Sequence, residues 1–81
     1  MEVLKTRSDR VVGTRAVLRG IRDAALACVY VAEDTDTFLF QRVTRAAESA
    51  GIPVKRVPSM AELGRACGVE VAAAAAGLPR L

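Results

Sequence analysis

The sequence predicts a layered α/β domain, in which helices pack on the faces of a sheet. Strand-like and helix-like patterns alternate along the 81 residues and end in a small-residue segment, as in folds built from right-handed crossovers. The chain is long enough for one core. That core must be aliphatic and rich in alanine, because 52% of the residues are hydrophobic and only 4% are aromatic. We therefore expect one domain over residues 1–81.

The first strand and helix follow a weakly patterned start. Residues 2–7 (EVLKTR) have helix-compatible content and are followed by a break at residues 8–9. Val11–Val12 then lead into Gly13, which predicts a short strand and a tight turn. Thr14 is expected to cap the helix that follows. At about 100° per residue, the apolar face of this helix holds Val17, Leu18, Ile21 and Ala25.

The middle of the chain carries the strongest strand and helix patterns. Leu26–Ala32 (LACVYVA) is a nearly continuous apolar run, which predicts a central strand covered on both faces. The polar turn at residues 33–36 can cap the next helix. Apolar residues then recur at helical spacing over residues 39–50, and Gly51 ends the helix. The side chains expected on its outward face are Arg42, Arg45 and Glu48.

The third strand and helix are short. Residues 52–57 (IPVKRV) predict a strand with a proline near its start, and the next proline stops it. Ser59 and Glu62 have the spacing of a helix capping box. Gly64 lies inside this helix, where glycine costs about 1 kcal/mol relative to alanine, so we expect it to admit another backbone at close range. The buried face is expected to hold Met60, Leu63 and Cys67, and the helix to end at Gly68.

The last segment is ambiguous in composition. Propensity alone favours a helix over residues 72–76, which are all alanine, but a strand of small residues buried under helices is also possible. Ligands of layered α/β folds usually bind at the loops beyond one edge of the strands. The Gly13 turn enters a helix and the Gly68 turn enters this last segment, and the residue pattern alone does not show whether the two turns meet.

Several kinds of site are excluded by residues that the chain lacks. It has no histidine, and its two cysteines, Cys28 and Cys67, do not form a C-x-x-C motif, which removes nearly every zinc or redox site. Both thiols are expected to pack in the core of a protein from a reducing compartment. Asp34 and Asp36 could form a metal pair, but helix capping explains them more simply. We expect no cofactor and no enzymatic activity, because no activated nucleophile or phosphate-cradling loop is present.

The positive charge of the chain is concentrated near its start. The formal net charge is +3, and residues 1–22 carry six basic side chains against two acidic ones. Helical spacing places Arg15, Arg19 and Arg22 on one stripe, away from the apolar face. A helix N-terminus offers unpaired N–H groups and a partial positive charge, so arginines beside it favour an anion such as phosphate. The alternative is a solvated basic face without a ligand.

The chain has no segment that would place it in a membrane. No hydrophobic leader opens the sequence, and no apolar run approaches the ~20 residues that span a bilayer. We therefore expect a cytoplasmic protein without a membrane partner, and the concentration of arginine around one helix start favours nucleic acid over a small-molecule substrate.

Three segments together carry a resemblance to a known family. Residues 11–22 (VVGTRAVLRGIR) have a strand, a glycine turn and a basic helix start, and residues 29–36 (VYVAEDTD) have a central strand and an acidic turn. Residues 57–75 (VPSMAELGRACGVEVAAAA) combine a capping box, two placed glycines and V-E-V. The chain resembles, over nearly its whole length, the kink-turn-binding ribosomal proteins, which include archaeal protein seven-Ae, eukaryotic thirty-e and bacterial YbxF and YlxQ.

The resemblance implies both a fold and a function. The fold is a three-layer α/β/α sandwich around a mixed sheet of about four strands, with the alanine-rich end as a strand. The function is non-enzymatic recognition of kink-turn-like bent RNA, in ribosomal or regulatory RNA, where the glycine turn meets the loop before the last strand. The residues assigned in this way are Gly13, Thr14, Arg15, Arg19, Val69, Glu70 and Val71, and the basic stripe adds Arg22 as a backbone contact.

The structure of RNA is compatible with these roles. A-form RNA hides its base edges in a deep, narrow groove, so proteins recognise bends, bulges and unstacked nucleotides. Gly13 would admit the RNA backbone, while Arg15 and Arg19 would screen the repulsion between the two backbones of a bend. Apolar residues 69 and 71 could cover an extruded base, although core packing is the alternative for at least one of them. Glu70 could accept a hydrogen bond from that base or fix the loop.

One position departs from the family pattern. Ala16 stands where relatives usually have glutamate or glutamine, which can take part in base recognition. The site could bind RNA with looser sequence preference, it could have moved to another RNA, or it could have lost RNA binding altogether. The alternative function is a ribosome-associated or protein-interaction scaffold on the same fold, which has lost kink-turn specificity and meets an acidic protein through its basic stripe.

Overall fold

The strands and helices alternate along the chain as the sequence predicts. The structure is a computed structural model and describes residue 4 and residues 6–80. The strands are β1 (Val11–Val12), β2 (Leu26–Ala32), β3 (Val54–Val57) and β4 (Ala75–Pro79). The helices are α2 (Thr14–Arg22), α3 (Thr37–Ser49) and α4 (Met60–Ala66). The four strands form one sheet in the order β1-β4-β2-β3, in which β2 is parallel to β3 and β4 is antiparallel to β1 and β2.

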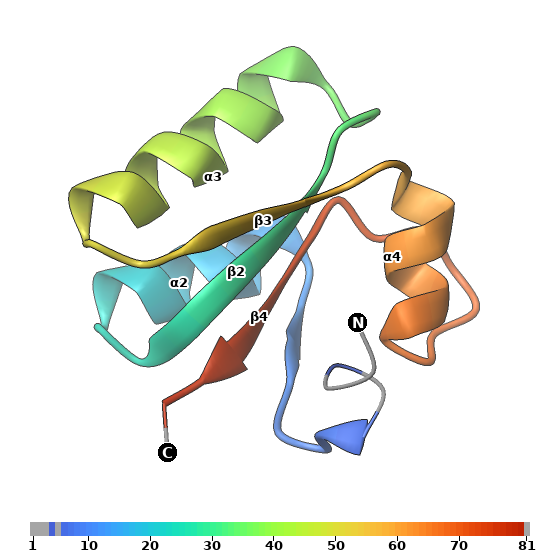
Figure 1. Cartoon of the computed structure of the whole chain (residues 1–81), viewed down its shortest axis with the longest axis horizontal. Coiled ribbons are helices and arrows are strands. Elements are labelled where there is room, and N and C mark those ends of the chain that lie inside the picture. Colours follow the sequence, from blue (N-terminus) through green and yellow to red (C-terminus); the bar gives the residue numbers. More distant parts are fainter. Residues whose placement is uncertain (1–3, 5, 81) are drawn as a thin grey trace.

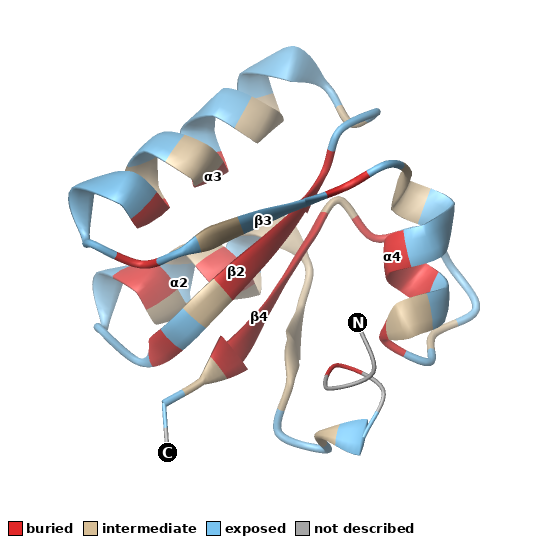
Figure 2. Ribbon diagram, in the orientation of Figure 1, coloured by how far each residue is buried: buried red, intermediate tan, exposed pale blue. Residues whose placement is uncertain are grey.

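Helices cover both faces of this sheet. Figure 1 shows α2 and α3 on one side and α4 on the other. Successive side chains of a strand point to opposite faces, so Val29 and Val31 of β2 pack with α2 and α3, whereas Tyr30 and Ala32 pack with α4. In Figure 2 the buried residues lie mainly along β2 and β4 and on the helix sides that face the sheet. The expected three-layer sandwich and the central strand over Leu26–Ala32 are confirmed.

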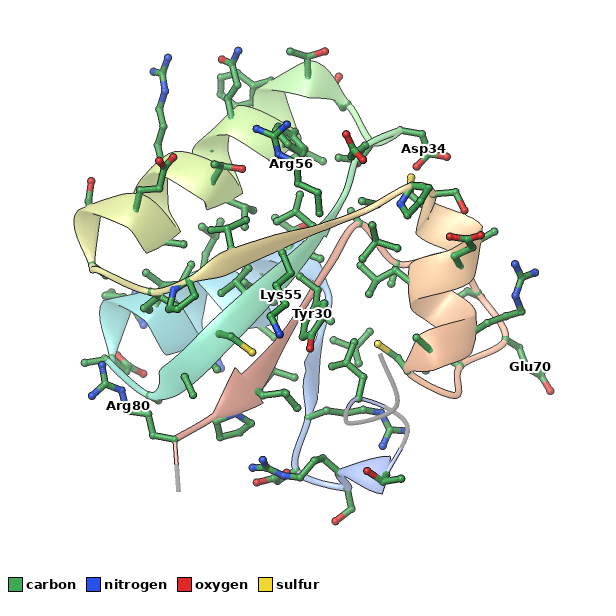
Figure 3. All side chains as sticks on the ribbon, viewed as in Figure 1. Tyr30, Asp34, Lys55, Arg56, Glu70 and Arg80 are labelled. Carbon is green, nitrogen blue, oxygen red and sulfur yellow. The ribbon has the colours of Figure 1, made fainter. Side chains whose placement is uncertain are left out.

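Three side chains cap the helices as the capping hypothesis predicts. Asp36 accepts a hydrogen bond from the Leu39 N–H at 3.2 Å and so caps α3. The Ser59 hydroxyl accepts from the Glu62 N–H at 3.1 Å at the start of α4. Asp34 (Figure 3) accepts from the Met60 N–H at 2.7 Å. Asp34 and Asp36 therefore serve two different helices, which explains both carboxylates without a metal.

The start and end of α2 differ from the prediction. Gly13, and not Thr14, is the N-cap residue, and no side chain caps this helix. Thr14 is already the first helical residue, so its hydroxyl does not occupy the position from which an N-cap side chain accepts a hydrogen bond. Ala25 does not extend the apolar face, because α2 ends at Arg22 and Ala24 turns the chain with a φ of +55°. Ala25 is exposed.

The last two strands begin later than predicted. β3 starts at Val54, after Pro53, which has no N–H to donate to a neighbouring strand. The Pro53 carbonyl oxygen accepts from the Val29 N–H at 3.0 Å. β4 contains only the last two alanines of residues 72–76, together with the residues that follow them. Pairing with β1 and β2 and burial on both faces override the helical propensity of alanine there. The Ala73 N–H instead donates to the Met60 carbonyl at 3.1 Å and holds the preceding loop against α4.

The first residues can be compared with the prediction only in part. Half of the helix-compatible segment over residues 2–7, namely residues 2, 3 and 5, lies outside the described residues. Leu4 is fully buried in the cluster on the α4 side of the sheet. Arg7 donates two hydrogen bonds to Asp9, at 2.8 and 2.7 Å, and this pairing lowers the pKa of the Asp9 carboxyl. The Arg10 guanidinium donates to the Arg7 carbonyl at 2.8 Å.

The two cysteines differ in burial. Cys67 has no exposed surface and belongs to the core on the α4 side, as expected. Cys28 is only partly buried, so the expectation of two buried thiols is wrong for this one. Cys28 lies on β2 between Ala27, which is exposed, and Val29, which is fully buried. Desolvation raises the pKa of the Cys67 thiol, and the nearby Arg10 charge offsets this only in part.

This difference predicts selective labelling of Cys28. At pH 8 and under native conditions, a thiol-specific disulfide reagent should modify one thiol quickly, because Cys67 is inaccessible and its raised pKa leaves less of the reactive thiolate. Cys28→Ser should remove the fast phase, and unfolding in denaturant should release the second thiol. Two fast thiols in the native protein would contradict this description of the core.

Candidate nucleic-acid interface

Helix α2 separates apolar and basic residues as predicted. Val17 and Ile21 are buried against the sheet, whereas Arg15, Arg19 and Arg22 are exposed. Leu18 is partly buried and packs at the margin of the same cluster. The stripe inferred from helical spacing therefore exists on the surface of the molecule.

These arginines line a groove between α2 and α3. The open concavity, with a volume of about 600 Å³, is lined by α2 residues and by one arginine of α3. We call it the basic groove, and its lining residues are Thr14, Arg15, Leu18, Arg19, Arg22 and Arg42. Arg42 was not predicted as part of the site. Its outward direction followed from the sequence, but which helix lies beside it depends on tertiary packing.

The arginines of the basic groove are almost free of acidic partners. Among the described residues the ion pairs are Arg7 with Asp9, at 2.7 Å, and Arg22 with Asp23, at 3.5 Å. The Arg22 pair is largely exposed, so it contributes little to stability. Within this part of the chain, Arg15, Arg19 and Arg42 have no carboxylate within 4.0 Å. The groove therefore carries uncompensated positive charge.

The Gly13 turn leaves open space at the start of α2. Gly13 has φ +102° and ψ 149°, a conformation almost confined to glycine. A Cβ atom at this position would have no neighbour within 4 Å. Because no side chain caps α2 and its first turn has no acidic residue, the first N–H groups remain available to an anion. The missing Thr14 cap thus leaves the helix start better suited to a ligand than we expected.

The 69–71 loop lies against α4. The Val69 N–H donates to the Gly64 carbonyl at 3.1 Å. A Cβ on Gly64 would overlap the Val71 carbonyl oxygen, which supports the expectation that Gly64 admits another backbone. Val69 is partly buried, but Val71 is 72% exposed. Glu70 is exposed and points away from the molecule in Figure 3.

One backbone hydrogen bond joins the Gly13 turn to the start of β4. The Gly13 N–H donates to the Ala75 carbonyl at 2.9 Å, where the chain leaves the loop and enters β4. The turn and the end of the loop are therefore neighbours, which the sequence alone could not establish. Val69, Glu70 and Val71 do not line the basic groove. The predicted residues thus form two separate surfaces, one on α2 and one against α4, and not one pocket.

Two basic side chains of strand β3 lie over aromatic rings of neighbouring elements. Arg56 lies 5.4 Å from the centre of the Phe40 ring, and Lys55 lies 5.7 Å from the centre of the Tyr30 ring. Figure 3 shows Lys55 beside Tyr30. The sequence analysis did not single out these pairs, because they depend on the register between strands and on the position of α3. They hold both cations on the protein surface.

Other kinds of site find no support in the described part of the chain. No group of three histidine, cysteine, aspartate or glutamate residues there could hold a metal ion. None of its helices has the length and hydropathy that crossing a bilayer requires. The chemistry that the basic groove offers is the binding of an anion, because its exposed arginines are almost free of carboxylate partners.

Comparisons with known sequences agree on one family. A sequence profile described as the ribosomal protein L7Ae/L30e/S12e/Gadd45 family matches residues 1–79. The chain is 43% identical over 70 residues to "RNA-binding protein GK0100" of Geobacillus kaustophilus, covering 86% of this chain and 85% of that protein. It is 41% identical over 70 residues to "RNA-binding protein YbxF" of Geobacillus stearothermophilus, with the same coverage.

Solved structures share the fold. The "15.5kD RNA binding protein" of Giardia lamblia superimposes with a TM-score of 0.88 at 23% identity, over 99% of this chain and 68% of that chain. A protein of unknown function from Bacillus halodurans gives a TM-score of 0.85 at 20% identity, over 98% of this chain and 79% of that one. Similarity at these identities establishes the architecture alone.

Proposed function

The chain belongs to the ribosomal protein L7Ae/L30e/S12e/Gadd45 family, and we propose that it binds RNA through the basic groove and the Gly13 turn. The family is non-enzymatic, in agreement with the expectation that the chain is not an enzyme. The observation that carries the proposal is the basic groove itself, in which exposed arginines without carboxylate partners lie beside an uncapped helix start. Such a surface is complementary to phosphates.

The RNA that fits these surfaces is sharply bent. A helix N-terminus enters a groove that opens where the duplex kinks, and the open space at Gly13 admits the backbone. Arg15 and Arg19 then neutralise phosphates of the two converging backbones. Because their charge stabilises the bent form more than the straight one, binding shifts the RNA toward the bend. Kink-turn-like RNA, in ribosomal or regulatory transcripts, is therefore the proposed target.

The 69–71 loop supplies an apolar contact to the same RNA. The Val71 side chain is exposed. A ligand that buried it fully would gain about 1.5 to 3 kcal/mol of binding free energy from this contact. An extruded base offers an apolar face that would cover it. Val69 packs in part against the α4-side core, so its role is to support the loop. Glu70 is free to accept a hydrogen bond from that base.

Ala16 limits what this site can read. Its methyl group cannot form the hydrogen bond that a glutamate or glutamine could make with a base edge. Recognition therefore rests on shape and on phosphate contacts, which position an RNA but carry little sequence information. We propose that the protein selects bent RNA with relaxed preference for the bases at the kink.

Arg19→Ala tests whether the basic groove carries RNA binding. Affinity for a kink-turn RNA should fall by about 1 to 3 kcal/mol, or roughly 5- to 150-fold in Kd. The slope of log Kd against log salt concentration should decrease by roughly one unit. Stability should change by less than about 0.5 kcal/mol, because the side chain is exposed.

Lys55→Ala is the matched control for this experiment. It removes one exposed positive charge from β3, at the opposite edge of the sheet from β1, and should leave affinity nearly unchanged. Equal losses in the two variants would show that net charge alone matters. An unchanged affinity in Arg19→Ala would place the RNA elsewhere on the molecule.

A further inference from the structure

The outward face of α3 carries an aromatic ring among arginines. Phe38, Gln41, Arg42 and Arg45 recur at helical spacing and line a shallow groove with a volume of about 310 Å³. We call this surface the α3 face. Seven residues separate its ends, which corresponds to roughly 10 Å along the helix axis. Phe38 and Arg45 have no role in the RNA-binding function proposed above.

Phe38 is not needed by the fold. It is 70% exposed, and α3 is held on the sheet by Val43 and Ala47, which are buried. Of the large hydrophobic side chains among the described residues, only Phe38 and Val71 are exposed to this degree. Val71 belongs to the loop already proposed to contact RNA. The Phe38 ring is therefore accessible to a ligand on the surface of α3.

The α3 face is continuous with the basic groove. Arg42 lines both concavities, so a ligand in one can extend into the other without leaving the protein surface. Within the described part of the chain, neither Arg42 nor Arg45 has a carboxylate within 4.0 Å. A planar ring flanked by unpaired arginines is the arrangement that proteins use to hold single-stranded nucleic acid, by base stacking and phosphate contacts.

We propose that the α3 face binds a single-stranded segment that extends from the RNA in the basic groove. Phe38 stacks on an unpaired base, and Arg42 and Arg45 contact the phosphates that flank it. This inference rests on the RNA-binding function proposed above and adds a second class of RNA element to it. Stacking does not depend on base identity, so the segment is recognised as unpaired and not by its sequence.

Two RNAs test the proposal directly. One is a blunt kink-turn duplex, and the other is the same duplex with an eight-nucleotide single-stranded extension. Fluorescence anisotropy should give an affinity of the wild-type protein about tenfold higher for the extended RNA. Phe38→Leu should remove this gain and leave the affinity for the blunt duplex unchanged. Phe38→Tyr should retain it, because the aromatic face is kept.

The outcomes separate this inference from the function on which it rests. Equal affinity of the wild-type protein for both RNAs, or a gain that survives in Phe38→Leu, overturns the stacking site alone. Failure to bind the blunt duplex overturns the kink-turn function, and the free octanucleotide with a 2-aminopurine then tests the α3 face separately. Quenching of the 2-aminopurine fluorescence of this octanucleotide by the wild-type protein, but not by Phe38→Leu, supports the stacking site. Binding of a polyglutamate peptide at Phe38, without any RNA gain, assigns the face to an acidic protein and overturns the proposal.

Discussion

Gly64→Ala is expected to destabilise the protein, although the same change in an ordinary helix is stabilising. Alanine gains about 1 kcal/mol over glycine in a helix interior. At this position, however, the added Cβ would overlap the Val71 carbonyl oxygen, which is backbone and cannot rotate away. The loop must move, and overpacking of this kind costs about 1 to 3 kcal/mol. Urea unfolding should therefore give a lower free energy of unfolding than for the wild type.

Ala61→Gly, on the exposed side of the same helix, provides the comparison. It should cost about 1 kcal/mol by propensity alone. Both substitutions, in opposite chemical directions, should thus be destabilising. Gly64→Ala should also weaken RNA binding because it displaces residues 69–71, whereas Ala61→Gly should not. A higher unfolding midpoint for Gly64→Ala would mean that the loop does not press on α4.

Gly13→Val should have a large effect on RNA binding. A β-branched residue at φ +102° is strained by about 1 to 3 kcal/mol, although its Cβ atom would have no neighbour within 4 Å. The space around this Cβ atom is where we place the RNA backbone. Valine should therefore reduce affinity more than tenfold, beyond the loss that follows from reduced stability.

Gly13→Ala separates backbone strain from bulk. Alanine introduces much of the backbone strain but adds only one carbon atom. It should therefore destabilise the fold, but it should impair RNA binding less than valine does. The measurements are urea unfolding and fluorescence anisotropy on both variants. Normal binding by Gly13→Val would reduce Gly13 to a turn residue without a role in RNA recognition.

The local sequence pattern correctly predicted those elements in which hydrophobic pattern, intrinsic propensity and burial all favour the same structure. Leu26–Ala32 is a strand because its apolar run, its β-branched centre and its burial all favour one state. Asp36 and Ser59 cap helices because capping depends on residues three positions away. The amphipathic character of α2 also follows from spacing alone. In each case the interacting groups lie close together in sequence.

Features that depend on distant residues could not be derived in this way. Asp34 was predicted to cap a helix, but its partner, Met60, is 26 residues away. Arg42 joins the basic groove only because α3 lies beside α2. The alanine-rich end becomes a strand because β1 and β2 offer hydrogen bonds that its own propensity does not anticipate. That the alanine-rich end is a strand was predicted only from the resemblance to a known family.

A comparison of bent and straight RNA tests the proposed recognition most directly. The wild-type protein is titrated with a kink-turn duplex and with a fully paired duplex of equal length and composition, at one salt concentration. We expect at least tenfold tighter binding to the kink-turn RNA, because the uncapped start of α2 and the space at Gly13 fit only an opened groove. Equal affinity for both duplexes would contradict kink recognition and reduce the basic groove to a general phosphate-binding surface.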